Sequence, residues 1–120
     1  TNGNVKDARV LVMGATFKEN VSDIRNSKVA DVIKELKAFS LNVDVTDPHA
    51  DSAELMHEYG FGLTPELSTD YDAVLVTVPH DDYKKLDDHY FASITKGHAI
   101  VADLKGIYRN KITSRKYWSL

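Results

Sequence analysis

The apolar stretch ARVLVMG, residues 8–14, decides how the fold is interpreted. It is short, rich in valine and apolar on both faces, which is typical of a buried strand in a parallel sheet. The polar run ATFKENVSDIR follows, and residues 26–39 then place apolar side chains at helical spacing with charged side chains between them. The pattern predicts a strand, a loop and an amphipathic helix.

Strand and helix patterns alternate along the rest of the chain. Residues 42–47, NVDVTD, predict a second strand that stops before Pro48. Residues 50–60 predict a short helix, which Asp51 can cap and Gly60 can end.

The second half of the chain repeats this alternation. Residues 71–79, YDAVLVTVP, form the clearest strand pattern of the sequence. Around it we expect a short strand at 61–63, broken helical turns over 81–97 that end at Gly97, and a last strand at 98–106, with 107–120 unassigned. Such an order predicts an α/β fold: an open, doubly wound, Rossmann-like and mostly parallel sheet of about five strands with helices on both faces.

The composition limits the classes of protein that the chain can be. With 42% hydrophobic and 28% charged residues and a net charge of −3, we expect one globular domain over residues 1–120 that binds neither nucleic acid nor membrane. The absence of cysteine excludes disulfides, thiolate metal sites and a cysteine nucleophile within this chain. No signal segment opens the chain, so we expect a cytoplasmic protein, and its start at Thr1 rather than Met suggests a piece of a longer one.

Polar side chains collect where the predicted strands end, which is the edge at which open α/β sheets bind ligands. They are Phe17 and Lys18, Asp47 and His49, Thr77 and His80, and Asp103 and Lys105. Lysines after the first and the last predicted strand place two cations along one edge. Such a pair suits a phosphate or diphosphate, especially beside the helix N-terminus near residues 25–27.

Each of these residues also has a simpler interpretation. Lys18 can be a solvated loop charge, and Arg25 can pair with Asp23 or Glu19 on the surface. The two histidines are more typical of turn caps or water-facing side chains than of metal ligands, so no metal site is predicted. Asp47 before Pro48 is a good turn former, and Gly14 can serve a tight turn.

Three familiar phosphate-handling patterns are excluded. GATFKEN has one glycine where a dinucleotide fingerprint needs three, and no Gly-Lys-Ser/Thr opens a helix as in a P-loop. A receiver-type signalling domain needs acidic residues after the first strand to hold a cation, but the chain has GATFK there.

Three stretches resemble one family, the UDP-glucose/GDP-mannose dehydrogenases. GATFKENVSDIRNSKV is similar to the segment that opens the C-terminal domain of these nucleotide-sugar 6-dehydrogenases, and DAVLVTVPHDDYKKLD and VADLKGIYRNK resemble later stretches of it. The likeness runs from about Val5 to Leu120, and FKEN with DIRN is most similar to the branch that acts on UDP-N-acetylhexosamines.

The resemblance implies roles for four residues. Phe17 and Lys18 match a pair that binds the UDP-sugar, and Arg25 matches an arginine that reaches the NAD pyrophosphate across an interdomain cleft. Lys105 stands where many members have an arginine that contacts substrate; a lysine there loses bidentate recognition and retains a point charge.

The family's reaction oxidises the C6 alcohol of the sugar to a carboxylate by two hydride transfers to NAD, through a thiohemiacetal on a cysteine. Members combine an NAD-binding domain, a central helical region that dimerises and this C-terminal domain. The resemblance therefore implies an NAD-dependent enzyme, homodimeric at full length and active in polysaccharide biosynthesis, of which this chain carries no catalytic residue. The alternatives are a non-enzymatic nucleotide-binding or regulatory module and a purely structural assembly domain.

Overall fold

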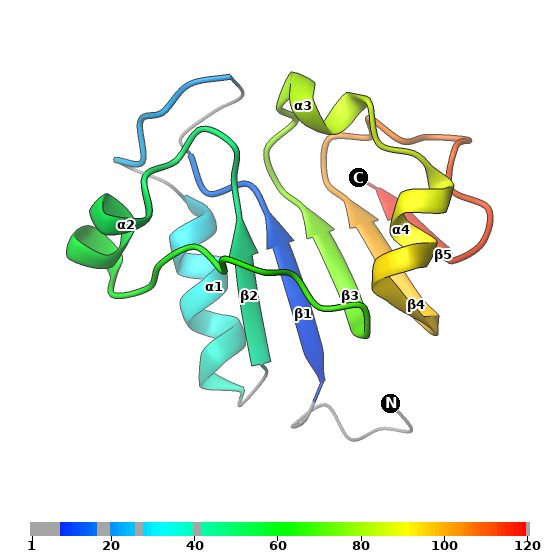
Figure 1. The fold of residues 1–120 in the computed structure, drawn as a ribbon, viewed down its shortest axis with the longest axis horizontal. Coiled ribbons are helices and arrows are strands. Elements are labelled where there is room, and N and C mark those ends of the chain that lie inside the picture. The colour runs from blue at the N-terminus through cyan, green and yellow to red at the C-terminus, as the bar shows by residue number, and fades with distance from the viewer. Residues whose placement is uncertain (1–7, 17–19, 26–27, 40–41, 120) are drawn as a thin grey trace.

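The structure is a computed structural model that describes residues 8–16, 20–25, 28–39 and 42–119. The strands are β1 (Arg9–Met13), β2 (Asn42–Thr46), β3 (Tyr71–Val76), β4 (Thr95–Asp103) and β5 (Lys116–Ser119). The helices are α1 (Lys28–Ala38), α2 (Ser52–Tyr59), α3 (Asp81–Lys84) and α4 (Asp88–Ile94) (Figure 1).

The strands form one parallel sheet in the order β2-β1-β3-β4-β5. Val10 of β1 lies opposite Val43 of β2 on one side and Ala73 of β3 on the other. The chain therefore winds outward in one direction from β1 to β2 and in the other direction from β3 to β5. This is the predicted doubly wound α/β sheet.

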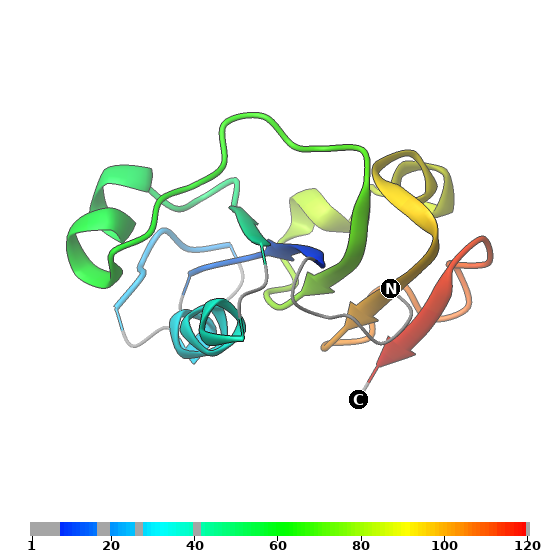
Figure 2. The same ribbon diagram turned by 90° about the horizontal axis from the view of Figure 1, so that it is seen from below.

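Helices cover both faces of the sheet, as predicted. Figure 2 shows α1 on one face and α4 on the other. Phe91 of α4 belongs to a core with Val74 and Val101, and Ile33 of α1 belongs to a second core with Val12. The strand residues alternate between these two cores because successive side chains of a strand point to opposite faces.

The cover on the α1 face is incomplete among the described residues. The helix lies under β1 and β2, and no described helix lies under β4 and β5 (Figure 2). Strand alternation places Ile100 and Trp118 on this face, where they are 38% and 46% exposed.

The ends of α2 confirm the capping prediction. The Asp51 carboxylate accepts the backbone N–H of Glu54, and Gly60 ends the helix with a φ of 84°. A positive φ suits glycine because it has no Cβ to clash with the backbone. The helix lies beyond the β2 edge of the sheet, and Leu55 joins it to the core on the α1 side (Figure 1).

Two predictions for the second half of the chain are wrong, and a segment left unassigned contains a strand. Residues 61–63 are not a strand: the next residue, Thr64, bonds Val45, and the buried Phe61 is held by packing. The last helix ends before Gly97, because β4 already begins at Thr95. The unassigned tail contains the fifth strand, β5, which pairs with β4. No described helix is both long and apolar enough to cross a membrane.

Candidate functional site

The loops after β1, β2, β3 and β4 emerge at one edge of the sheet because all strands are parallel (Figure 1). The winding direction reverses between β1 and β3, and open α/β sheets bind their ligands at this reversal. The candidate site is therefore the set of loops at the carboxyl ends of β1 and β3, with the neighbouring loops on either side.

The β1 and β3 loops meet in direct contact at the reversal. Gly14 has a φ of 114°, and a Cβ added to it would lie 2.7 Å from the Cβ of Val78. The Thr77 hydroxyl donates to the backbone oxygens of Met13 and Gly14 at 2.9 and 2.7 Å. Glycine thus allows a close approach of two backbones, which is a stronger requirement than the tight turn predicted from the sequence.

The Asp47 carboxylate is the centre of this edge. Its side chain has no exposed surface. One oxygen, Oδ2, accepts the backbone N–H groups of Ala15 and Thr16 at 2.7 and 3.3 Å, and Oδ1 accepts those of His49 and Ala50 at 2.7 and 3.0 Å. Asp47 therefore ties the β1 loop to the β2 loop, and several N–H donors stabilise a buried carboxylate.

The His80 ring fills the space between the β3 loop and these two loops. It is fully buried, and its Nε2 lies 2.9 Å from Asp47 Oδ2. Asp47 thus forms the turn considered from the sequence, through its bonds to His49 and Ala50, but it also joins the β1 loop to the β2 loop. Of the turn-cap or water-facing role considered for His80, the burial of the ring excludes the water-facing one. Both are interior polar groups with hydrogen-bond partners, as burial requires. Among the described residues, no group of His, Asp and Glu is arranged to hold a metal ion.

A second buried carboxylate organises the loop that carries Lys105. The Asp103 side chain is fully buried at the end of β4, and Oδ2 accepts the N–H of Tyr108 at 2.7 Å and the hydroxyl of Tyr117 at 2.5 Å. Burial and this carboxylate raise the pKa of Tyr117 to about 12. Gly106 turns with a φ of 71°, and Lys105 beside it is exposed. The turn thus presents the lysine to solvent.

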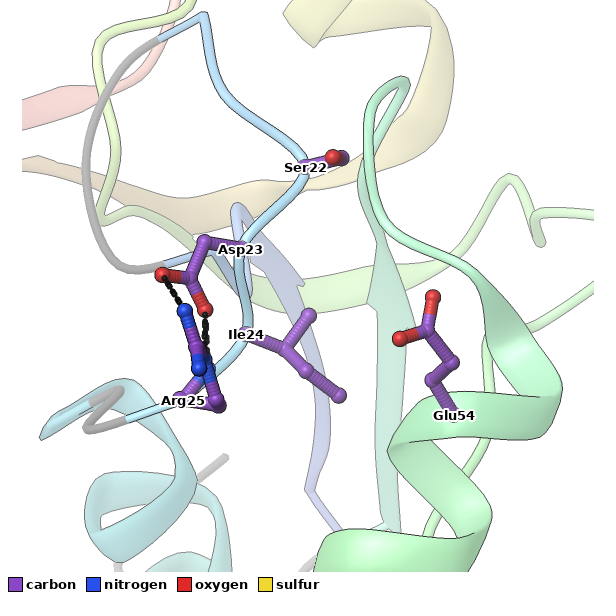
Figure 3. A pocket seen from close by; sticks show the side chains of 5 residues that line it. All are labelled: Ser22, Asp23, Ile24, Arg25 and Glu54. Carbon is purple, nitrogen blue, oxygen red and sulfur yellow. Dashed lines mark hydrogen bonds and ion pairs between the residues drawn. The ribbon is translucent and has the colours of Figure 1, made fainter.

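Arg25 lines an open pocket of about 440 Å³ on the β2 side of this edge. Figure 3 shows Ser22, Asp23, Ile24 and Arg25 on the loop before α1 and Glu54 facing them from α2. The Arg25 side chain is 80% exposed and pairs with Asp23, Nε to Oδ1 at 3.0 Å and Nη2 to Oδ2 at 3.2 Å. The surface pairing considered from the sequence is therefore present.

The charges of this pair stabilise each other. The guanidinium hydrogen bond holds the pKa of the Asp23 carboxyl below its usual value, and the carboxylate raises the pKa of Arg25. An arginine carries five N–H donors, and Asp23 accepts hydrogen bonds from two of the nitrogen atoms, Nε and Nη2. Arg25 therefore retains donors for a further anion.

The structure describes some of the predicted ligand residues but not all of them. Phe17 and Lys18 lie outside the described residues, and the neighbouring positions Thr16 and Asn20 lie at the carboxyl edge. Lys105 follows β4, which is separated from β1 by β3 alone. With neighbouring strands about 4.8 Å apart, the loops after β1 and β4 start about 10 Å from each other.

Comparison with known proteins agrees with this geometry. Residues 11–110 match the UDP-glucose/GDP-mannose dehydrogenase family, UDP binding domain. The chain belongs to this family.

Several members with assigned names are similar to the chain. It is 41% identical over 103 residues to UDP-N-acetyl-D-glucosamine 6-dehydrogenase of Salmonella typhi, an alignment that covers 85% of this chain and 24% of that protein. It is 42% identical over 120 residues to Protein CapL of Staphylococcus aureus, covering 97% of this chain and 28% of that protein. The chain thus spans about a quarter of the length of these family members.

Solved structures of the family share the fold. The UDP-N-acetyl-mannosamine dehydrogenase Cap5O of Staphylococcus aureus superimposes with a TM-score of 0.74 at 25% identity, over 94% of this chain and 26% of that one. The NDP-N-acetyl-D-galactosaminuronic acid dehydrogenase of Methanosarcina mazei Go1 gives a TM-score of 0.83 at 18% identity, over 98% and 26%. The doubly wound sheet of this chain is therefore that of a UDP-sugar dehydrogenase domain.

Proposed function

We propose that the chain is the UDP-sugar-binding C-terminal domain of an NAD-dependent UDP-N-acetylhexosamine 6-dehydrogenase. The family match over residues 11–110 carries the proposal. The names of the more similar members, with their N-acetylhexosamine substrates, support the choice of sugar class. A protein that oxidises the C6 alcohol of such a sugar would supply uronates for polysaccharide synthesis.

The diphosphate is held by cations from separate loops. Lys18 and Lys105 contribute the charges, and Phe17 packs against the UDP-sugar. The carboxylates nearest to these loops, Asp47 and Asp103, are buried and accept backbone N–H groups. They therefore position the loops through hydrogen bonds to the backbone.

NAD contacts this domain through Arg25 and is bound mainly by another domain. Its exposed guanidinium lines the pocket beside α2 and retains N–H donors for a pyrophosphate oxygen. The remaining cofactor contacts belong to another domain, since GATFKEN lacks the glycine pattern that receives a dinucleotide. When bound, NAD accepts the hydride.

The contribution of this chain to catalysis is positioning. The sequence has no cysteine, so the nucleophile also belongs to another part of the enzyme. Binding energy from the remote nucleotide holds the sugar against chemistry that takes place elsewhere. We further propose that the complete protein is a cytoplasmic homodimer.

Calorimetry of the 120-residue chain with UDP tests the proposal. We expect weak binding that Lys105→Ala and Lys18→Ala each weaken about fivefold, since an exposed charge-assisted hydrogen bond contributes about 1 kcal/mol. Lys37→Ala is the matched control: it removes the same charge from the far end of α1. Unchanged affinity in both test variants, or an equal loss in the control, would contradict the proposed site.

A further inference from the structure

The buried imidazole of His80 has no part in the proposed ligand contacts, yet it joins all three loops at the reversal of the sheet. The ring is fully buried. Its polar neighbours come from the β1 loop, Thr16 and Asn20, and from the β2 loop, Asp47. The His49 ring lies 4.6 Å away and the Tyr83 ring 5.5 Å away, centroid to centroid.

The hydrogen bonds assign the protons of this ring. Nδ1 lies 2.8 Å from the backbone nitrogen of Asn20, and a backbone N–H can only donate. Nδ1 is therefore the acceptor, and the neutral ring carries its proton on Nε2. That proton points at Asp47 Oδ2 at 2.9 Å, with the Thr16 hydroxyl at 3.2 Å.

One ring thus contacts two described positions of the β1 loop. The Thr16 hydroxyl lies against Nε2, and the Asn20 N–H donates to Nδ1. Asn20 stands in the left-handed region with a φ of 61°, and its side-chain oxygen accepts the N–H of Asp81 at 2.9 Å. Asparagine tolerates this region better than most other residues, and both of these Asn20 hydrogen bonds lead to the β3 loop. The Asn20 position therefore depends on the β3 loop.

We propose that His80 is a positioning residue, which fixes the β1 loop in its UDP-binding conformation through the bond from the Asn20 N–H to Nδ1. The inference rests on the proposed function, since it assigns the loop that His80 holds to the diphosphate. Asp47 has the supporting role: it orients the ring by accepting the proton on Nε2. The ring itself does not touch the ligand.

Two substitutions separate the two bonds of the ring. His80→Gln places an amide N–H where Nε2–H stands, so it retains the bond to Asp47 and loses the acceptor for Asn20. His80→Asn places a carbonyl oxygen where Nδ1 stands, so it retains the acceptor and loses the donor to Asp47. Both leave space in a buried site and are expected to lower the stability of the chain to urea.

UDP affinity, measured by calorimetry on the folded chain, distinguishes positioning from stability alone. We expect His80→Gln to weaken UDP binding by up to about tenfold, the limit set by the loss of one hydrogen bond of about 1.4 kcal/mol that holds the loop, and His80→Asn to stay within about threefold of the wild type. Equal losses in the two variants, or no loss in either, would overturn the positioning role.

Nuclear magnetic resonance supplies a readout that does not need the ligand. Nitrogen-15 spectra should show Nδ1 of His80 unprotonated and Nε2 protonated, and the Asn20 amide should exchange slowly in the wild type and in His80→Asn but rapidly in His80→Gln. A ring protonated on Nδ1 at neutral pH would overturn the inference. A wild-type chain that shows these signals but binds no UDP would instead contradict the proposed function, and it would contradict the ligand-positioning role as well.

Discussion

At the scale of single residues, the close approach of Gly14 and Val78 brings the β1 and β3 loops into contact at the reversal of the sheet. The Thr77 hydroxyl adds hydrogen bonds to Met13 and Gly14 across the same contact. The chain has no glycine-rich phosphate cradle, which is consistent with recognition by side-chain cations.

Gly14→Ala tests this contact. The new methyl group would lie 2.7 Å from Val78 Cβ and 2.8 Å from its backbone nitrogen, in a backbone conformation that alanine disfavours. We expect a loss of about 2–4 kcal/mol in the free energy of unfolding, measured by urea denaturation. Gly97→Ala is the matched control, since no atom lies within 4 Å of its added methyl group, and we expect a change below about 1 kcal/mol. Comparable losses in the two variants would contradict the contact.

The sequence predicted which residue types gather at the carboxyl edge but not how they are buried. Asp47 and His80 were recognisable as polar residues at strand ends, and their mutual bond joins positions that are 33 residues apart. Such a pair depends on the order of the strands in space, which local patterns do not contain. Asp47 followed by Pro48 also matches an ordinary turn, so the pattern favoured the simpler interpretation.

At the scale of elements, one carboxylate of α4 adds to the pairing of the last strand with β4. Asp88 opens α4, and its two oxygens accept the backbone N–H groups and the hydroxyls of Thr113 and Ser114, just before β5. These hydrogen bonds, those of Ser114 first, hold the pKa of Asp88 at about 2, well below its usual value. These hydrogen bonds thus tie the residues just before β5 to α4.

Asp88→Ala should lower the melting temperature of the chain by several degrees at pH 7. Because the folded state depresses the pKa of Asp88, its contribution is complete above the unfolded pKa of about 3.9 and is lost as the pH falls toward 2. The difference in melting temperature between wild type and variant should therefore shrink between about pH 5 and pH 2. Glu66→Ala, which removes an exposed carboxylate from a loop, controls for net charge. A difference that stays constant down to pH 2 would show that Asp88 acts through packing instead.

The sequence pattern did not predict β5, and the structure of this region shows why. Its four residues alternate between exposed and half-buried positions, and the strand is too short to stand out from a polar tail. Its place depends on Asp88 and on the bond from Tyr117 to Asp103, both of which bridge distant positions. Residues 61–63 show the opposite error. Their apolar pattern predicted a strand, but the segment is not a strand, and Phe61 and Leu63 pack against the core on the α1 side.

At the scale of the whole molecule, the alternating pattern was sufficient to predict the doubly wound sheet with helices on both faces. Alternation implies parallel strands, and parallel strands bring every β-to-α loop to one edge. The proposed diphosphate contacts and the Arg25 pocket lie on loops at this edge, on either side of the reversal. The proposed NAD contact, Arg25, and part of the proposed UDP-sugar site thus belong to the same connection between β1 and α1, and Lys105 belongs to the loop after β4.

Arg25 should therefore affect NAD more than the sugar in a complete enzyme that carries this domain. We expect Arg25→Ala to raise the KM for NAD about tenfold and to change the KM for the UDP-sugar little, because a charge-assisted contact to the pyrophosphate is lost. Asp23→Asn should act in the opposite direction and lower the KM for NAD, since Asp23 competes for the same guanidinium. Lys37→Ala controls for the loss of a positive charge at the other end of α1. Steady-state kinetics with each substrate varied in turn makes the comparison, and a larger effect of Arg25→Ala on the sugar nucleotide than on NAD would assign this arginine to the UDP site instead.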